Sequence, residues 1–156
     1  MPRPYRAPIM FNGHEIKAAG VLLYAVDSDQ KIWVLLRTTK NKGFSDFGGK
    51  NEPSDQTPLD LAIRKCVSES CQVLEAQKLK EIIDPEFYDH IKGSKYILYY
   101  AKIDKIDLNE MQSRDVEMEG NHEFKWFLNG VAPKHCRIAP LNIIQRIKQL
   151  EEKERK

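Results

Sequence analysis

The feature that most constrains the fold is a glycine turn that leads into an amphipathic helix, in the stretch GGKNEPSDQTPLDLAIRKCVSESCQV (residues 48–73). Pro58 suits the first helical position, where its missing N–H costs nothing, and Thr57 is a good N-cap. The pattern therefore predicts a helix over residues 58–71 with one stripe of residues in the core. This stripe contains Leu59, Ala62, Ile63, Cys66 and Ser70.

Apolar segments on either side of this helix read as strands. AAGVLLYAVD (18–27) is apolar enough to be buried on both faces, and KIWVLLRTT (31–39) is expected to be its hairpin partner. KYILYYAKI (95–103) and EFKWFLNG (123–130) predict two further strands, and residues 140–156 predict a second helix. KNKGFSDFGGK (40–50) is expected to be a loop. The order of elements predicts one mixed α/β or α+β domain.

The ends of the chain are expected to lie outside the folded core. Prolines in residues 1–13 predict an extended arm without regular hydrogen bonding, and residues 151–156 a charged, fraying helix end. The folded domain is therefore expected over residues 14–150. No apolar run approaches the roughly 20 residues of a membrane span, and no secretion signal is apparent. We expect an intracellular protein, cytoplasmic or nuclear, without a membrane partner.

The charge and cysteine content exclude some classes of protein. The 156 residues carry a formal net charge of +2, too small to imply nucleic acid or membrane as a partner by itself. Cys66, Cys71 and Cys136 form no metal-binding or disulfide pattern, so we expect small buried hydrophobes in a reducing compartment.

The glycine loop and helix resemble the box of the Nudix family, whose signature runs Gly, five residues, Glu, seven residues, Arg-Glu-apolar-x-Glu-Glu-x-Gly. Gly49 matches the opening glycine, and Asp55 stands where the first Glu belongs. One extra residue, placed most simply at Gln56, precedes the match of Arg64 to the arginine. The strands before and after extend the resemblance over roughly residues 15–150. It implies a Nudix-like α/β/α sandwich with a mixed sheet, in a single domain.

The metal ligands that this resemblance implies are mostly replaced. In the family, three glutamates of the box helix bind divalent cations, usually magnesium or manganese, which activate water and neutralise phosphate oxygens. Lys65 and Ser68 stand at the first two of these positions, Glu69 at the third, and Cys71 replaces the closing glycine. Gly49 with Glu69 would make a poor magnesium cage, and the ammonium of Lys65 would repel the metal. The resemblance therefore implies a degenerate box.

Two interpretations of this site remain open. In the first, the fold has lost hydrolysis and recognises a diphosphate-containing nucleotide or an RNA end, as a possible pseudoenzyme. Lys65 would then replace the cation, with Lys50, Lys42, Arg64 and Phe47 as further contacts. Alternatively Arg64 only orients the loop, paired with Asp60 one turn back, and Glu69 is a solvated acid paired with Lys65. For Phe47, anchoring of the loop is the competing role.

In the second interpretation the chain is an active, metal-dependent pyrophosphohydrolase. Glu69 would act with acids from outside the box helix, from the glycine loop (Glu52 and Asp55) or from the segment RDVEMEGNHEF (114–124). In this segment we name Glu119 and Glu123 as catalytic candidates. Some family members take a base or an additional metal ligand from such a loop, although a charge-rich loop is usually solvated surface.

A third class of function is a scaffold that binds a macromolecular partner. The arm PRPYR (2–6) could lie on RNA, with Tyr5 stacked on a base. Both charged ends would serve equally well to keep the chain soluble. Nudix proteins are often dimers, so the resemblance also implies a possible homodimer.

Overall fold

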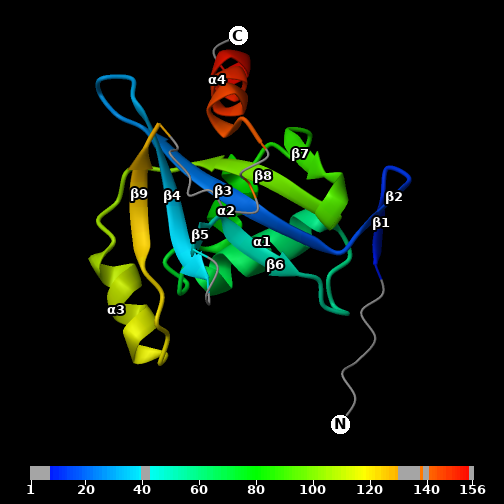
Figure 1. The fold of residues 1–156 in the computed structure, drawn as a ribbon, viewed down its shortest axis with the longest axis horizontal. Coiled ribbons are helices and arrows are strands. Elements are labelled where there is room, and N and C mark those ends of the chain that lie inside the picture. The colour runs from blue at the N-terminus through cyan, green and yellow to red at the C-terminus, as the bar shows by residue number, and fades with distance from the viewer. Residues whose placement is uncertain (1–7, 40–42, 130–137, 139–140, 155–156) are drawn as a thin grey trace. The chain divides into compact units, whose positions relative to one another are not determined.

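The computed structural model describes residues 8–39, 43–129, 138 and 141–154. Within this part, seven strands form one sheet in the order β5-β4-β3-β8-β7, with β6 paired to β3 and β9 to β4 (Figure 1). The amides of Lys17 and Ala18 donate to the carbonyl of Lys95, and the amide of Ile103 donates to the carbonyl of Tyr24. These bonds make β3 and β8 parallel in an otherwise antiparallel sheet. The predicted mixed α/β class is confirmed.

Contacts within the chain define two compact units, residues 1–21 with 47–99 and residues 22–46 with 100–156. We call them unit 1 and unit 2. Strands β3 (Ala18–Val26) and β8 (Tyr96–Lys102) each run through both units, as expected of a single domain.

Unit 1 contains the predicted box helix. Besides the first parts of β3 and β8, its elements are β1 (Ile9–Phe11), β2 (His14–Ile16), β6 (Phe47–Lys50), α1 (Pro58–Glu69), α2 (Ala76–Ile82), β7 (Tyr88–Ile91) and the short 3₁₀ helix Lys92–Ser94. Helix α1 packs against β6, and its buried residues include Leu61, Ala62, Ile63 and Cys66. Leu61 is fully buried and Leu59 only partly, so Leu61 takes the central core position expected for Leu59.

Unit 2 contains the rest of β3 and β8 with β4 (Ile32–Thr39), β5 (Gly43–Ser45), α3 (Asn109–Glu117), β9 (Phe124–Leu128) and α4 (Ile143–Glu154). The expected hairpin is confirmed, with Leu23 opposite Leu35. Strand β9 pairs along the other edge of β4, with Trp126 opposite Leu35. Helix α4 buries Ile143, Ile147 and Leu150.

Three sequence predictions need correction. The glycine stretch expected to be a loop contains β5, which pairs with β4, and β6, in which Gly48 and Gly49 pair with Gly20 and Ala19 of β3. The box helix ends at Glu69, since Cys71 and Gln72 have φ values of 55° and 63°. The last part of the expected arm is a hairpin strand, with Ile9–Phe11 paired to β2 through a turn at Asn12 and Gly13; residues 1–7 lie outside the described part.

Other predictions concern single features. Cys66 and Cys71 are buried free thiols, as expected, and Cys136 lies outside the described residues. No helix in the described part is long and apolar enough to span a membrane. Helices α2 and α3 and strand β7 were not predicted, because each is short and polar.

Candidate functional site

The start of α1 is built as the sequence predicts. Pro58 is the first helical residue, and the hydroxyl of Thr57 accepts a hydrogen bond of 3.1 Å from the amide of Asp60. This cap satisfies one of the amides that a helix leaves without an intrahelical partner. It fixes where α1 begins and therefore which side chains of the helix face β6.

Gly48 of β6 has no room for a side chain. A Cβ at this position would collide with the hydroxyl of Tyr96 and would lie 2.6 Å from the carbonyl oxygen of Ala19. The amide of Gly48 donates a hydrogen bond of 2.7 Å to Oε1 of Glu69. The one acid retained from the metal-binding positions of the box therefore ties the end of α1 to the glycine strand.

Lys65 lies against the neighbouring glycine. A Cβ built on Gly49 would be 3.0 Å from Cε and 3.4 Å from Nζ of Lys65, so the end of this side chain lies over the glycine backbone. In the described part of the chain Lys65 forms no ion pair, and the predicted pairing with Glu69 is wrong. The ammonium therefore brings a positive charge to Gly49, which was predicted as a metal ligand.

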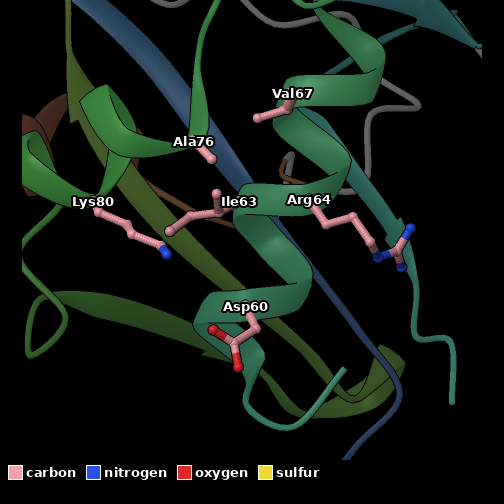
Figure 2. A pocket seen from close by; sticks show the side chains of 6 residues that line it. All are labelled: Asp60, Ile63, Arg64, Val67, Ala76 and Lys80. Carbon is pink, nitrogen blue, oxygen red and sulfur yellow. The ribbon is translucent and has the colours of Figure 1, made fainter. Parts of the chain in front are cut away.

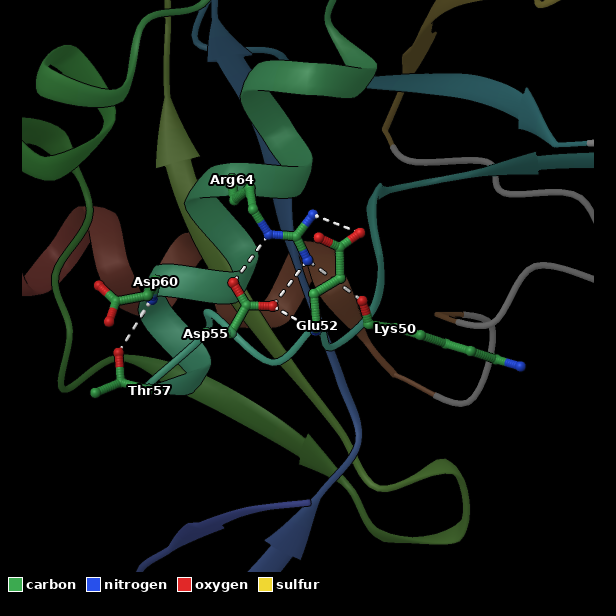
Figure 3. A network of polar contacts seen from close by, with 6 residues as sticks. All are labelled: Lys50, Glu52, Asp55, Thr57, Asp60 and Arg64. Atoms are coloured by element: carbon green, nitrogen blue, oxygen red, sulfur yellow. Dashed lines mark hydrogen bonds and ion pairs between the residues drawn. The ribbon is translucent and has the colours of Figure 1, made fainter. Parts of the chain in front are cut away.

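Arg64 holds the loop that precedes α1 (Figure 3). Its Nε and Nη2 donate to the two carboxylate oxygens of Asp55 at 2.9 and 2.8 Å, and Nη2 also lies 3.5 Å from the carbonyl of Lys50. Nη1 lies 3.5 Å from Oε1 of Glu52. The predicted partner, Asp60, is instead engaged at the helix cap through its amide. Asp55, in the loop before α1, therefore takes the bidentate place that helical spacing assigned to Asp60.

We call these contacts of Arg64 with Asp55, Glu52 and the carbonyl of Lys50 the Arg64 clamp. The charges in this clamp shift two pKa values. Burial alone would raise the pKa of Asp55, but hydrogen bonds from Arg64 and the amide of Glu52, with the charges of Arg64 and Lys65, lower it overall. The hydrogen bond to Asp55 raises the pKa of Arg64. Asp55 is thus an ionised partner of Arg64, and Arg64 positions the loop.

The other predicted contacts of unit 1 have different surroundings. Phe47 has no exposed surface and lies opposite Val21, so its role is packing and no ligand can reach its ring in this structure. Lys50 is exposed and its side chain points away from the Arg64 clamp (Figure 3). Ser68 is also exposed.

The segment 114–124 belongs to unit 2 and contains a second clamp. Asp115 is 5% exposed, and it accepts hydrogen bonds from the amide of His122 at 2.9 Å and from its ring Nδ1 at 2.8 Å. The predicted acids Glu119 and Glu123 are both exposed. The amide of Glu123 donates to the hydroxyl of Thr38 at 2.7 Å. That these two acids serve the box site stays a prediction.

The side chains around Gly49 do not fit a divalent cation. Of the three helix positions, one carries an ammonium, one a hydroxyl, and the third a carboxylate bonded to Gly48. Across the described residues, no group of three or more His, Cys, Asp or Glu side chains is arranged to hold a metal ion. What the arrangement does offer is a lysine ammonium beside a glycine backbone, which suits a phosphate oxygen.

The fold resembles those of solved Nudix proteins. No protein-family model matches the chain, and no curated protein sequence matches it. The Nudix hydrolase RenU of M. smegmatis superposes with a TM-score of 0.53 at 16% identity, over 94% of this chain and 95% of that one. The Ap4A hydrolase of C. elegans gives 0.56 at 17% identity, over 87% and 98%. NrtR of Shewanella oneidensis gives 0.51 at 14%, over 86% and 64%. At these identities the likeness shows that the chain has a Nudix fold.

Proposed function

We propose that unit 1 recognises a diphosphate-containing nucleotide or RNA end at Gly49 and Lys65, with hydrolysis lost or much reduced. The observation that carries this proposal is the end of the Lys65 side chain, which lies over Gly49 without an ion pair among the described residues. A lysine is a mobile point charge that binds phosphate without a metal. Lys50, the next residue of β6, is exposed, but successive side chains of a strand point to opposite faces, so Lys65 is the cation at Gly49 in this structure.

The acids near this site support binding more than metal-dependent catalysis. Glu69 accepts from Gly48, and Asp55 accepts from Arg64 and Glu52. Both oxygens of Asp55 and Oε1 of Glu69 already accept hydrogen bonds that stabilise the preceding loop and the glycine strand, so recruiting Asp55 as a magnesium ligand would break one of them. Arg64 is committed to Asp55 and is a positioning residue in this proposal.

The charge of the site and the structural likeness support the proposed ligand class. Two of the solved structures are of an Ap4A hydrolase, whose name gives Ap4A as what it acts on. Lys65 matches a negative charge of a diphosphate that is esterified at both ends. We therefore expect dinucleotides, nucleotide sugars or capped RNA ends to bind without added magnesium.

The first test is thermal protection with a matched pair of variants. The purified protein is heated with Ap4A, ADP-ribose, nucleotide sugars, nucleoside triphosphates or capped RNA, in EDTA. At about a hundred times Kd a ligand stabilises by about 2.7 kcal/mol, which raises Tm by about 5–10 °C. Protection should disappear in Lys65→Met and remain in Lys78→Met, an exposed lysine of α2. Equal protection in both variants would contradict the proposal.

The second test asks whether hydrolysis survives. The same compounds are incubated with magnesium or manganese, and Glu69→Gln runs beside the wild type. We expect no turnover. Metal-dependent turnover that falls in Glu69→Gln would establish the alternative, an active hydrolase, and Glu119 and Glu123 would be replaced next.

Restoring the acids tests the assignment of the box positions. Calorimetry should detect magnesium binding by the double variant Lys65→Glu with Ser68→Glu and none by the wild type. Two added carboxylates beside Glu69 give the oxygen ligands that magnesium prefers. No gain in affinity would mean that these residues do not share a site.

A further inference from the structure

A second candidate site lies on α1, between this helix and α2 (Figure 2). It is a pocket with a volume of about 350 Å³, within the range usual for small-molecule sites. Its lining residues come from both helices: Asp60, Ile63, Arg64 and Val67 of α1, and Ala76 and Lys80 of α2. Lys65 and Glu69 are not among them, so this pocket is separate from the proposed nucleotide site.

The pocket has an apolar end and a charged end. Val67 and Ala76 lie together at one end, and Ile63 lies between them and the other (Figure 2). Asp60 belongs to the first turn of α1 and Lys80 to the last turn of α2. Because the two charged residues lie away from Val67 and Ala76, a ligand with one apolar part and one charged head would match the lining.

The two charges at this end are uncompensated by other side chains. In the part of the chain that is described, neither the carboxylate of Asp60 nor the ammonium of Lys80 forms an ion pair or a hydrogen bond. The guanidinium of Arg64 is held by Asp55, so only the stem of Arg64 contributes to the pocket. The site therefore offers a ligand one acid and one base, with no excess of either sign.

We propose that this pocket binds a free α-amino acid with an apolar side chain. Its ammonium pairs with Asp60, its carboxylate pairs with Lys80, and its side chain contacts Ile63, Val67 and Ala76. An amphipathic acid would satisfy only Lys80, and an amphipathic amine only Asp60. A zwitterion is the head group that satisfies both, and each charge-assisted hydrogen bond adds to the affinity.

The test is an amide-resolved NMR titration of the full chain with L-phenylalanine and L-leucine. Saturable shifts are expected at residues 60–67 and 76–80. Two single-charge analogues of phenylalanine serve as comparisons: 3-phenylpropionate lacks the amine, and phenethylamine lacks the carboxylate. Each should bind about ten-fold more weakly, the effect of losing one charge-assisted hydrogen bond.

Variants separate this site from a general surface effect. Asp60→Asn and Lys80→Gln change exposed side chains and should leave the fold intact. Each should weaken phenylalanine binding about ten-fold, whereas Lys78→Gln, on the same helix but outside the pocket, should not. The proposal is overturned if phenylalanine gives no saturable shifts, if 3-phenylpropionate binds as tightly, or if the two pocket variants bind like the wild type. None of these readouts depends on nucleotide binding.

Discussion

Two clamps in this molecule use the same acceptor, a buried aspartate, and differ in how many of its bonds come from a side chain. In unit 1, Asp55 receives two bonds from the side chain of Arg64 and a third from the backbone amide of Glu52. In unit 2, Asp115 receives one bond from the ring of His122 and one from its backbone amide. In the first clamp a substitution of Arg64 removes two of the three bonds, and the bond from the amide of Glu52 remains. The second clamp keeps one of its two bonds with any residue except proline at position 122.

Removing the guanidinium of the first clamp should have the largest effect. In Arg64→Met, the carboxylate of Asp55, whose side chain is 3% exposed, loses its charged partner. Arg64 itself is partly exposed, so we expect a loss at the low end for buried pairs, about 3 kcal/mol in the free energy of unfolding. Urea denaturation measures this loss.

The matched control is Asp60→Asn. This residue stands one turn before Arg64 and was the expected partner, yet its carboxylate takes no part in the clamp. Its replacement should change the free energy of unfolding by less than about 0.5 kcal/mol. A larger loss in Asp60→Asn than in Arg64→Met would reverse the assignment of the partner.

A substitution of Gly120, which lies against the carboxylate of Asp115, should disrupt the second clamp. A Cβ on Gly120 would collide with Oδ1 of Asp115 and lie 2.7 Å from its Cγ. Gly120→Ala must therefore displace the carboxylate from His122, at a cost of about 2 kcal/mol. In Gly93→Ala the new Cβ meets nothing within 4 Å, so this control should unfold like the wild type. Equal stability of the two variants would show that the carboxylate moves aside freely.

The sequence predicted the helix that carries Arg64 but not the acid that pairs with it. Thr57, Pro58 and the apolar spacing located α1 to within two residues, because caps and periodicity are local properties. The partner of Arg64 depends on the path of residues 50–56, which helical spacing does not describe and which places Asp55 against the guanidinium. A rule based on helical spacing therefore selected Asp60.

The second clamp was not predictable, although Asp115 and His122 both lie in the segment RDVEMEGNHEF (114–124). They are seven residues apart, and the chain between them leaves α3 and turns at Glu119, which has a φ of 59°. No sequence pattern specifies such a turn. Strand β6 was also missed, because glycines disfavour strands. A glycine is required at position 48 because Tyr96 and Ala19 leave no room for a side chain there, and this packing is not visible in the sequence.

Acid should weaken the first clamp through Asp55. Its pKa in the folded protein is below the value of about 3.9 in the unfolded chain, so the stabilisation is fully present above that value and is lost as the pH falls through the folded pKa. Wild type should therefore be more stable than Asp55→Asn at pH 5, and the difference should shrink below pH 4. Urea denaturation of both proteins at several pH values measures it. A difference that stays constant to pH 2 would mean that the charge of Asp55 does not contribute.

The smallest effect is expected where the second clamp keeps its backbone bond. In His122→Gln the ring donor is lost, but the amide of residue 122 still donates to Asp115, and the glutamine amide can donate in place of the ring. We expect a loss of about 1 kcal/mol in the free energy of unfolding, the value of one hydrogen bond. The comparison with Asp115→Ala, which removes both bonds, isolates the contribution of the ring. If His122→Gln were as unstable as Asp115→Ala, the backbone bond would contribute nothing, and the second clamp would depend on the ring of His122 alone.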